Sequence, residues 1–179
     1  MSRIAPVVSS NADSKVAITL SQVEKSLRMV PNLFATLANA PVALDGFLSL
    51  SKTLSRGRLT ARQREIVALA VGQENECRYC LSAHTASSRG VGLNDDGALK
   101  ARNGDGDDPF ERALASFAKV IVRQRGHLSN EELESARGAG IDDGLVMEII
   151  ANVALNTFTN YVNEVADTEI DFPEVQVTL

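Results

Sequence analysis

Both cysteines of this 179-residue chain stand close together as Cys77 and Cys80, and one of its two histidines, His84, follows four residues later. A carboxylate, Glu65, precedes Cys77 by twelve residues on an otherwise apolar run. Thiols are the nucleophiles of redox chemistry, and imidazole and carboxylate groups carry the protons that it moves. The spacing therefore indicates a redox site of the C-x-x-C type within residues 60–92.

A helix is expected to carry the carboxylate. Thr60 followed by Gln63 fits a capping box, which predicts a helix that begins near Ala61 and ends near Gly72. The neighbours of Glu65 three and four positions away are mostly apolar, and such neighbours share a helical face. We therefore expect Glu65 to be at least partly buried, with a pKa raised by burial, as suits a proton carrier.

A second helix is expected from about Cys77 to Ser88, with Gly90 as its stop signal. Its first turn places Cys77 where free backbone N–H groups favour a thiolate. Cys80 lies one turn later, and the spacing of four predicts that the imidazole of His84 lies beside the Cys80 sulfur. The helix terminus favours Cys77 as the low-pKa thiol and the imidazole favours Cys80; we assign the reactive role to Cys80.

The order of Glu65, Cys77-Arg-Tyr-Cys80 and His84 resembles the signature of the alkylhydroperoxidase AhpD-like, or carboxymuconolactone decarboxylase-like, family. The resemblance spans the whole redox stretch. It implies that Cys80 reacts with a peroxide and that Cys77 then resolves the product to a disulfide. It also implies that Glu65 and His84 form a proton relay.

The chain departs from the best-characterised members of this family at Tyr79, where those enzymes carry a histidine. This departure bears on the preferred peroxide and on the reducing partner, and not on the thiol chemistry. The resemblance implies an external dithiol as reductant, either a dihydrolipoyl group or a thioredoxin-like protein. It implies no haem, flavin or metal cofactor.

Composition excludes several classes of protein. Lys and Arg number 18 against 23 Asp and Glu, a net charge of −5 that argues against a nucleic-acid partner. Apolar runs are too short to span a membrane, and the N-terminus lacks the apolar core of a signal peptide. Two cysteines in a C-x-x-C do not form a secreted disulfide framework. We therefore expect a cytoplasmic protein.

Helical periodicity extends over most of the chain and predicts an all-α fold. The family resemblance implies that this fold is an AhpD-like helical bundle. We expect an N-terminal arm over residues 1–20, a helical domain over residues 21–167 and a C-terminal tail over residues 168–179. Helices are expected at about residues 21–29, 33–38, 42–55, 61–72, 77–88, 94–102, 109–125, 129–138 and 142–166. The last has so wide an apolar face that a homo-oligomer is expected, and the resemblance implies a trimer or a hexamer.

Other interpretations of the redox stretch remain open. One is the lyase branch of the same fold, a muconolactone decarboxylase, which needs no thiol pair. Another is a non-catalytic module that senses redox state or holds zinc, although Cys77, Cys80 and His84 supply only three ligands. Glu65, in turn, could pair with Arg62 on the surface.

Two further features have undecided roles. Asn152, Asn156 and Asn160 form a polar stripe on the apolar last helix, and we interpret them as buried hydrogen-bond partners between helices or subunits. A role for them in lining the site is the less favoured interpretation. Tyr79 either donates a hydrogen bond near the sulfurs or only packs.

Overall fold

The computed structural model describes residues 2–8 and 12–179, and within these ranges it is all-α, without a β-strand. This confirms the predicted fold class. The elements are α1 (Ser14–Leu27), α2 (Asn32–Leu37), α3 (Pro41–Leu54), α4 (Ala61–Glu74), α5 (Arg78–Ser88), the 3-10 helix η2 (Arg89–Val91), α6 (Asp95–Asn103), α7 (Pro109–Gln124), α8 (Asn130–Gly138) and α9 (Asp143–Ala166).

The first helix begins at Ser14, earlier than the start near Ser21 that a capping box predicted. Asp13 is the N-cap, and its side chain accepts hydrogen bonds from the backbone N–H groups of Lys15 and Val16. Part of the expected N-terminal arm is therefore helix, and residues 1 and 9–11 of that arm lie outside the described residues. The division into arm, domain and tail stays a prediction.

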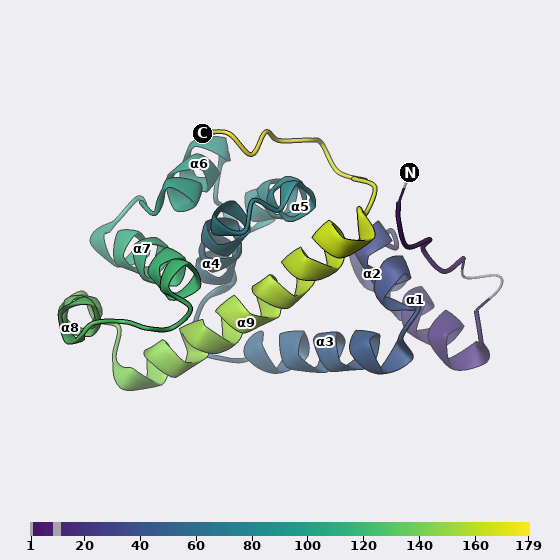
Figure 1. The fold of residues 1–179 in the computed structure, drawn as a ribbon, viewed down its shortest axis with the longest axis horizontal. Helices are drawn as coiled ribbons and strands as arrows, with labels where there is room; N and C mark the ends of the chain where they lie inside the picture. Colours follow the sequence, from purple (N-terminus) through teal and green to yellow (C-terminus); the bar gives the residue numbers. More distant parts are fainter. Residues whose placement is uncertain (1, 9–11) are drawn as a thin grey trace.

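Helix α4 forms the centre of the fold, with α5, α6, α7 and α9 packed around it. Figure 1 shows α4 and α5 behind the long, yellow-green α9, with α7 and α8 toward one end and α1 toward the other. From Ile66 to Val71 every residue of α4 is buried. Burial of one large aliphatic side chain contributes about 1.5–3 kcal/mol, so α4 is firmly held where it carries Glu65.

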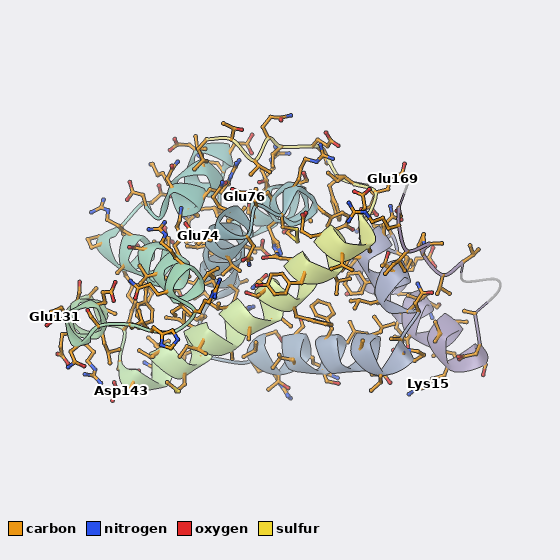
Figure 2. The ribbon with its side chains drawn as sticks, in the orientation of Figure 1. Lys15, Glu74, Glu76, Glu131, Asp143 and Glu169 are labelled. Carbon is orange, nitrogen blue, oxygen red and sulfur yellow. A yellow bond between two sulfur atoms is a disulfide. The ribbon has the colours of Figure 1, made fainter. Side chains whose placement is uncertain are left out.

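The redox pair belongs to a second, smaller apolar cluster. There Cys77, Tyr79 and Cys80 pack with buried side chains of α1, α2 and α3, such as Leu20 and Leu33. The start of α5 thus lies between the α4 core and the N-terminal helices. Charged side chains such as Lys15, Glu131 and Asp143 lie at the outside of the molecule (Figure 2).

The tail after α9 is extended and returns across the molecule toward α6 (Figure 1). Near its start the Asp171 carboxylate accepts the backbone N–H of Asn32 at 2.8 Å. Near its end the guanidinium of Arg102 donates to the carbonyls of Gln176 and Val177. No helix of the described residues has the length and apolar character needed to cross a bilayer.

Candidate active site

Glu65 on α4 and His84 on α5 are brought together, as the relay hypothesis requires. Nδ1 of His84 lies 2.9 Å from Oε2 of Glu65, and the hydroxyl of Ser87 donates to the same oxygen at 2.9 Å. The capping box of Thr60 and Gln63 is present and starts α4 at Ala61, as predicted. The side chain of Glu65 is 20% exposed and that of His84 28%, so the pair is mostly shielded from water.

The contact changes the acidity of both groups. Burial favours the neutral form of Glu65, but the charge of His84 and the hydrogen bonds from His84 and Ser87 outweigh it and lower the pKa. The expectation of a raised carboxyl pKa is therefore wrong, because a cationic partner compensates for burial. For His84 burial favours the neutral imidazole, but the adjacent Glu65 outweighs it and raises the pKa above its ordinary value.

Arg62 is not the partner of Glu65. Its Nε donates to the Glu111 carboxylate at 2.6 Å and its Nη2 to Asp107 at 2.6 Å. It also donates to the carbonyl of Gly92. The surface ion pair considered as an alternative for Glu65 is therefore absent, and His84 and Ser87 hold the carboxylate instead.

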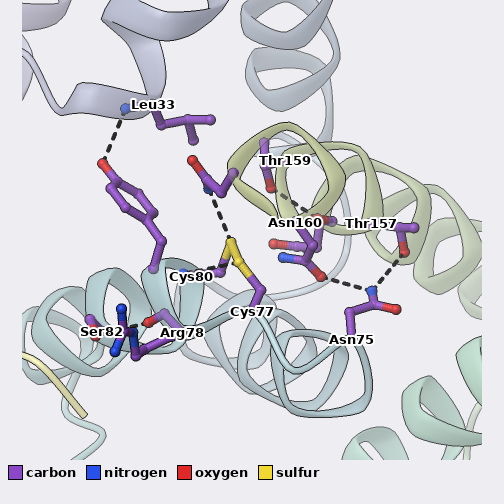
Figure 3. The surroundings of a disulfide bond; sticks show 12 residues. Leu33, Asn75, Cys77, Arg78, Cys80, Ser82, Thr157, Thr159 and Asn160 are labelled. Carbon is purple, nitrogen blue, oxygen red and sulfur yellow. Dashed lines mark hydrogen bonds between the residues drawn. A yellow bond between two sulfur atoms is a disulfide. The ribbon is translucent and has the colours of Figure 1, made fainter. Parts of the chain in front are cut away.

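Cys77 and Cys80 are joined by a disulfide with a Cα–Cα distance of 5.3 Å. Cys77 is the N-cap of α5, and its Sγ accepts the backbone N–H of Cys80 at 3.3 Å. Figure 3 shows the two sulfur atoms between the start of α5 and the face of α9. Both residues are buried, Cys77 completely and Cys80 to all but 3%.

The two pairs share no hydrogen bond among the described residues in this disulfide form. Over residues 2–8 and 12–179, no hydrogen bond joins His84 to either sulfur. The imidazole uses Nδ1 for Glu65 on α4, whereas the Cys80 sulfur accepts a hydrogen bond from α9. The spacing of four therefore did not produce a hydrogen bond between the imidazole and the sulfur in this form, and their proximity stays a prediction.

Asn163 is the residue that sequence reasoning missed. Its Nδ2 donates to Sγ of Cys80 at 3.3 Å, and its side chain is buried. The available signal was the asparagine stripe itself, because Asn163 lies three residues beyond Asn160 and so on the same side of the helix. An interval of four, which links Asn152, Asn156 and Asn160, passes over Asn163.

The rest of the stripe divides into two kinds. Asn160 accepts the Nδ2–H of Asn75, the C-cap of α4, at 2.8 Å, which is the interhelical bond expected (Figure 3). Asn152 and Asn156 instead donate to carbonyls of their own helix, four residues back. Asn156 also borders the pocket described below.

Tyr79 holds the start of α5 against α2 and the tail. Its hydroxyl accepts the backbone N–H of Leu33 at 3.2 Å, and its ring meets the ring of Phe172 edge-on at 5.8 Å. Burial, with the carboxylate of Asp171 nearby, raises its pKa. Among the described residues the Tyr79 hydroxyl forms no hydrogen bond to either sulfur.

A pocket of about 440 Å³ opens beside the Glu65–His84 pair. His84 and Ser87 lie on its wall with the aromatic rings of Phe34, Phe47 and Phe172. Neither cysteine is among the described residues that line it. A molecule in this pocket would meet the imidazole on a largely apolar surface.

The described residues contain no group of three or more His, Cys, Asp and Glu side chains placed to hold a metal ion. The three residues considered as zinc ligands have other partners. Cys77 and Cys80 are bonded to each other, and His84 is bound to Glu65. The geometry therefore offers no support for a zinc site.

Comparison with known proteins gives a family match for part of the chain. Residues 41–102, which include all four candidate site residues, match the carboxymuconolactone decarboxylase family. No curated protein matches the chain significantly.

Solved structures match almost the whole chain. A peroxidase-related protein of Ralstonia eutropha JMP134, described as an alkylhydroperoxidase AhpD core, has a TM-score of 0.86 at 24% identity and covers 95% of this chain and 92% of its own. A peroxidase-related protein of Silicibacter sp. TM1040 has a TM-score of 0.80 at 22% identity, with coverage of 89% and 86%. The debrominase Bmp8 has a TM-score of 0.79 at 22% identity, with coverage of 94% and 91%.

At these identities the structural matches establish the fold, and the family match covers the segment that carries the site. Both agree with the resemblance drawn from Glu65, the cysteine pair and His84. Residues 41–102 thus match the model of the carboxymuconolactone decarboxylase family, and the chain that contains them has the AhpD-like fold.

Proposed function

We propose that this protein is a thiol-dependent peroxidase of the alkylhydroperoxidase type, which reduces a hydroperoxide at the expense of a dithiol. The observation that carries the proposal is the Cys77–Cys80 disulfide at the start of the helix that also presents His84 to Glu65. One helix thus holds a reversible two-electron couple and a proton-carrying pair.

In the proposed cycle, the Cys80 thiolate attacks one peroxide oxygen, and the O–O bond breaks. The product alkoxide takes up a proton and leaves as an alcohol, while Cys80 becomes a sulfenic acid. The Cys77 thiol then attacks that sulfur, water leaves, and the disulfide forms. An external dithiol, a dihydrolipoyl group or a thioredoxin-like protein, returns two electrons and two protons.

Protons travel through His84 in this proposal. Glu65 occupies Nδ1, so Nε2 is the nitrogen left to serve a substrate in the adjoining pocket. Because no direct hydrogen bond links His84 to Cys80, the peroxide itself or a water molecule must bridge Nε2 and the sulfur. The raised pKa of His84 favours an imidazolium that can protonate the departing alkoxide.

Partners and location follow from the same chemistry. We expect the protein to act in the cytoplasm, where dithiol reductants keep such a pair reduced. We also expect a homo-oligomer, a trimer or a hexamer, because α9 exposes large apolar side chains that a second copy can cover.

Rapid mixing of the reduced protein with one equivalent of cumene hydroperoxide tests the proposal. Wild type should consume the peroxide and lose both free thiols. Cys80→Ser should consume none, and Cys77→Ser should stop after one turnover with a sulfenic acid that dimedone labels. Consumption by Cys80→Ser but not by Cys77→Ser would reverse the two roles, and no consumption by wild type would rule out the peroxidase.

A second candidate is reductive debromination of an aromatic compound. It is favoured by the aromatic wall of the pocket beside His84 and by the likeness to Bmp8, which was solved in complex with 2,3,4-tribromopyrrole after one of its cysteines was replaced by alanine. Two thiols would become a disulfide while a C–Br bond becomes C–H and hydrogen bromide is released. Bromide release from tribromopyrrole by the reduced protein tests this candidate.

A decarboxylase acting on a muconolactone is the remaining alternative, and it needs no thiol. Alkylation of both cysteines should abolish peroxide consumption or debromination but spare a thiol-independent lyase. A non-catalytic redox sensor would form the disulfide without multiple turnover when an excess dithiol is supplied.

A further inference from the structure

Helix α9 reaches the redox pair through the side chain of Asn163. The amide Nδ2 donates to Sγ of Cys80 at 3.3 Å, and both residues are only 3% exposed. The Cys77 sulfur has a different donor, the backbone N–H of Cys80 at 3.3 Å. Each sulfur therefore has its own hydrogen-bond donor, and only that of Cys80 comes from a side chain.

The orientation of the Asn163 amide follows from the chemistry of the sulfur. A disulfide sulfur carries no proton and can only accept, so the amide nitrogen must face Cys80 and the oxygen must point elsewhere. That oxygen, Oδ1, is buried and has no hydrogen-bond partner among residues 2–8 and 12–179. A buried acceptor without a donor costs free energy, so structural stability alone is a poor reason for an asparagine at this position.

We propose that Asn163 is a catalytic residue of the proposed peroxidase, which stabilises the Cys80 sulfur without its proton and so selects it over Cys77 as the attacking atom. The inference rests on the proposed function. An N–H donor strengthens its bond when the acceptor gains a full negative charge, as the sulfur does on becoming a thiolate. The donor already lies at the sulfur in the disulfide form, so reduction needs no movement of α9 to supply it.

Other titratable side chains surround the pair. Those on the surrounding elements are Glu76 and Arg78 beside Cys77, Tyr79 and His84 on α5, Glu65 on α4, Asp171 in the tail and Glu164 on α9. Among the described residues none of these side chains is hydrogen-bonded to a sulfur. Asn163 alone within that set of contacts distinguishes one sulfur from the other through a side chain.

The unused oxygen has a role in the same cycle. Reduction of the disulfide gives two thiols, and loss of the Cys80 proton gives the thiolate that Nδ2 holds. When that thiolate takes an oxygen from the peroxide, an S–O bond forms and the O–O bond breaks. The new sulfenic hydroxyl is a donor, and Oδ1 of Asn163 is a buried acceptor on the adjoining side chain.

The test measures each thiol in the reduced protein without any peroxide. Iodoacetamide labels the cysteines between pH 5 and 9, and mass spectrometry follows Cys77 and Cys80 separately. In Asn163→Ala the midpoint of the Cys80 profile should rise by about one pH unit, which is a tenfold loss of thiolate well below the midpoint. The Cys77 midpoint should not move. The midpoint is the readout because altered access changes rates without changing it.

Asn152→Ala is the matched control, since its Nδ2 binds the carbonyl of Glu148 on the same helix and not a sulfur. It should leave both midpoints as in wild type. Asn163→Asp, equal in size but with an acceptor in place of the donor, should raise the Cys80 midpoint further. An unchanged Cys80 midpoint in the Asn163 variants, or an equal rise for Cys77, overturns the proposal.

A measurement on the unsubstituted protein covers the case in which the Asn163 variants do not fold. The side-chain NH₂ signals of Asn163 in the reduced protein should shift with the midpoint at which Cys80 is labelled. Chemical shifts of Asn163 that do not change across the Cys80 titration would overturn the proposal. Neither experiment uses peroxide. If the wild-type protein fails to consume hydroperoxide, the proposed function is wrong, but the effect of Asn163 on the Cys80 midpoint can still be measured.

Discussion

The imidazole of His84 binds the carboxylate of Glu65 across the α4–α5 interface, with 2.9 Å between Nδ1 and Oε2. Glu65→Gln removes the charge that raises the pKa of His84 but leaves the burial that lowers it. The pKa of His84 should therefore fall below 6.5 in this variant. NMR titration of the imidazole signals measures this, with the second histidine, His127, as a reference in the same spectra. An unchanged His84 pKa would show that Glu65 does not govern its protonation.

The same pair gives stability a defined pH dependence. The lowered pKa of Glu65 contributes stability above pH 4.5, which is lost as pH falls through the folded-state value. The raised pKa of His84 contributes stability below pH 6.5, which is lost as pH rises through its folded-state value. Wild type should therefore exceed Glu65→Gln most between roughly pH 4.5 and 6.5, by about 1 kcal/mol in the free energy of unfolding.

Urea unfolding at pH 5.5 and at pH 9 measures this difference. Asp95→Asn is the control, because it breaks the exposed ion pair with Arg89 and involves no histidine. Asp95→Asn should lower the free energy of unfolding only slightly at either pH. A difference between wild type and Glu65→Gln that is equally large at pH 9 would mean that the carboxylate acts without the imidazolium.

Local sequence signals predicted the elements that hold the site. The capping box at Thr60 and Gln63 predicted the start of α4, and the helix predicted from about Cys77 agrees with α5, which begins at Arg78 with Cys77 as its N-cap. Both depend on residues close together in the chain, which is why sequence suffices. The predicted start of the first helix is wrong because α1 begins after Asp13, a single N-cap that lacks the capping-box partner.

Contacts between distant segments were not predictable in the same way. The hydrogen bond from Asn163 to Cys80 joins residues 83 positions apart in the sequence, and the bond from Arg62 to Glu111 joins residues 49 positions apart. Helical periodicity tells which residues share a face, but not which neighbouring helix that face meets. For the same reason the spacing of His84 after Cys80 could not reveal that the imidazole would bind α4 instead of the sulfur.

Arg62 and Glu111 form a shielded ion pair that holds α4 against the start of α7. Arg62→Met would leave the Glu111 carboxylate, whose side chain is 8% exposed, without its closest cation. Removal of one partner of a buried pair is strongly destabilising, so we expect a loss of about 3 kcal/mol in urea unfolding. Arg112, also on α7, forms an exposed pair with Asp105 in the preceding loop, and Arg112→Met should cost less than about 1 kcal/mol. Equal losses in the two variants would contradict this account of the pair.

The C-terminal tail is held at its end by Arg102, a buried cation that binds two tail carbonyls and the side chain of Gln73. Arg102→Met should release the end of the tail, so that the amides of residues 174–179 exchange hydrogen at least tenfold faster by mass spectrometry. The backbone N–H of Val175, which lies within that segment, donates a hydrogen bond to the hydroxyl oxygen of Ser82 on α5.

Lys100→Met on the same helix is the control for the tail, because Lys100 pairs only with exposed Asp96 and Asp107 among the described residues. In this variant the tail amides should exchange hydrogen at the wild-type rate. Tail exchange that is unchanged in Arg102→Met would mean that the anchor near Asp171 and Asn32 suffices by itself.

The outward face of α9 is where we expect copies of the chain to meet. Met147, Tyr161 and Val165 are 62%, 60% and 64% exposed, and such large apolar side chains gathered on one helix favour association. A buried carboxylate in that interface would cost several kcal/mol, so Val165→Glu should reduce the mass measured by light scattering from a multiple of 19.2 kDa to 19.2 kDa. Leu99 is also an exposed apolar residue but lies on α6, apart from that face of α9. Leu99→Glu should therefore leave the assembly intact. A wild type of 19.2 kDa, or a Val165→Glu variant of undiminished mass, would mean that α9 does not form the interface.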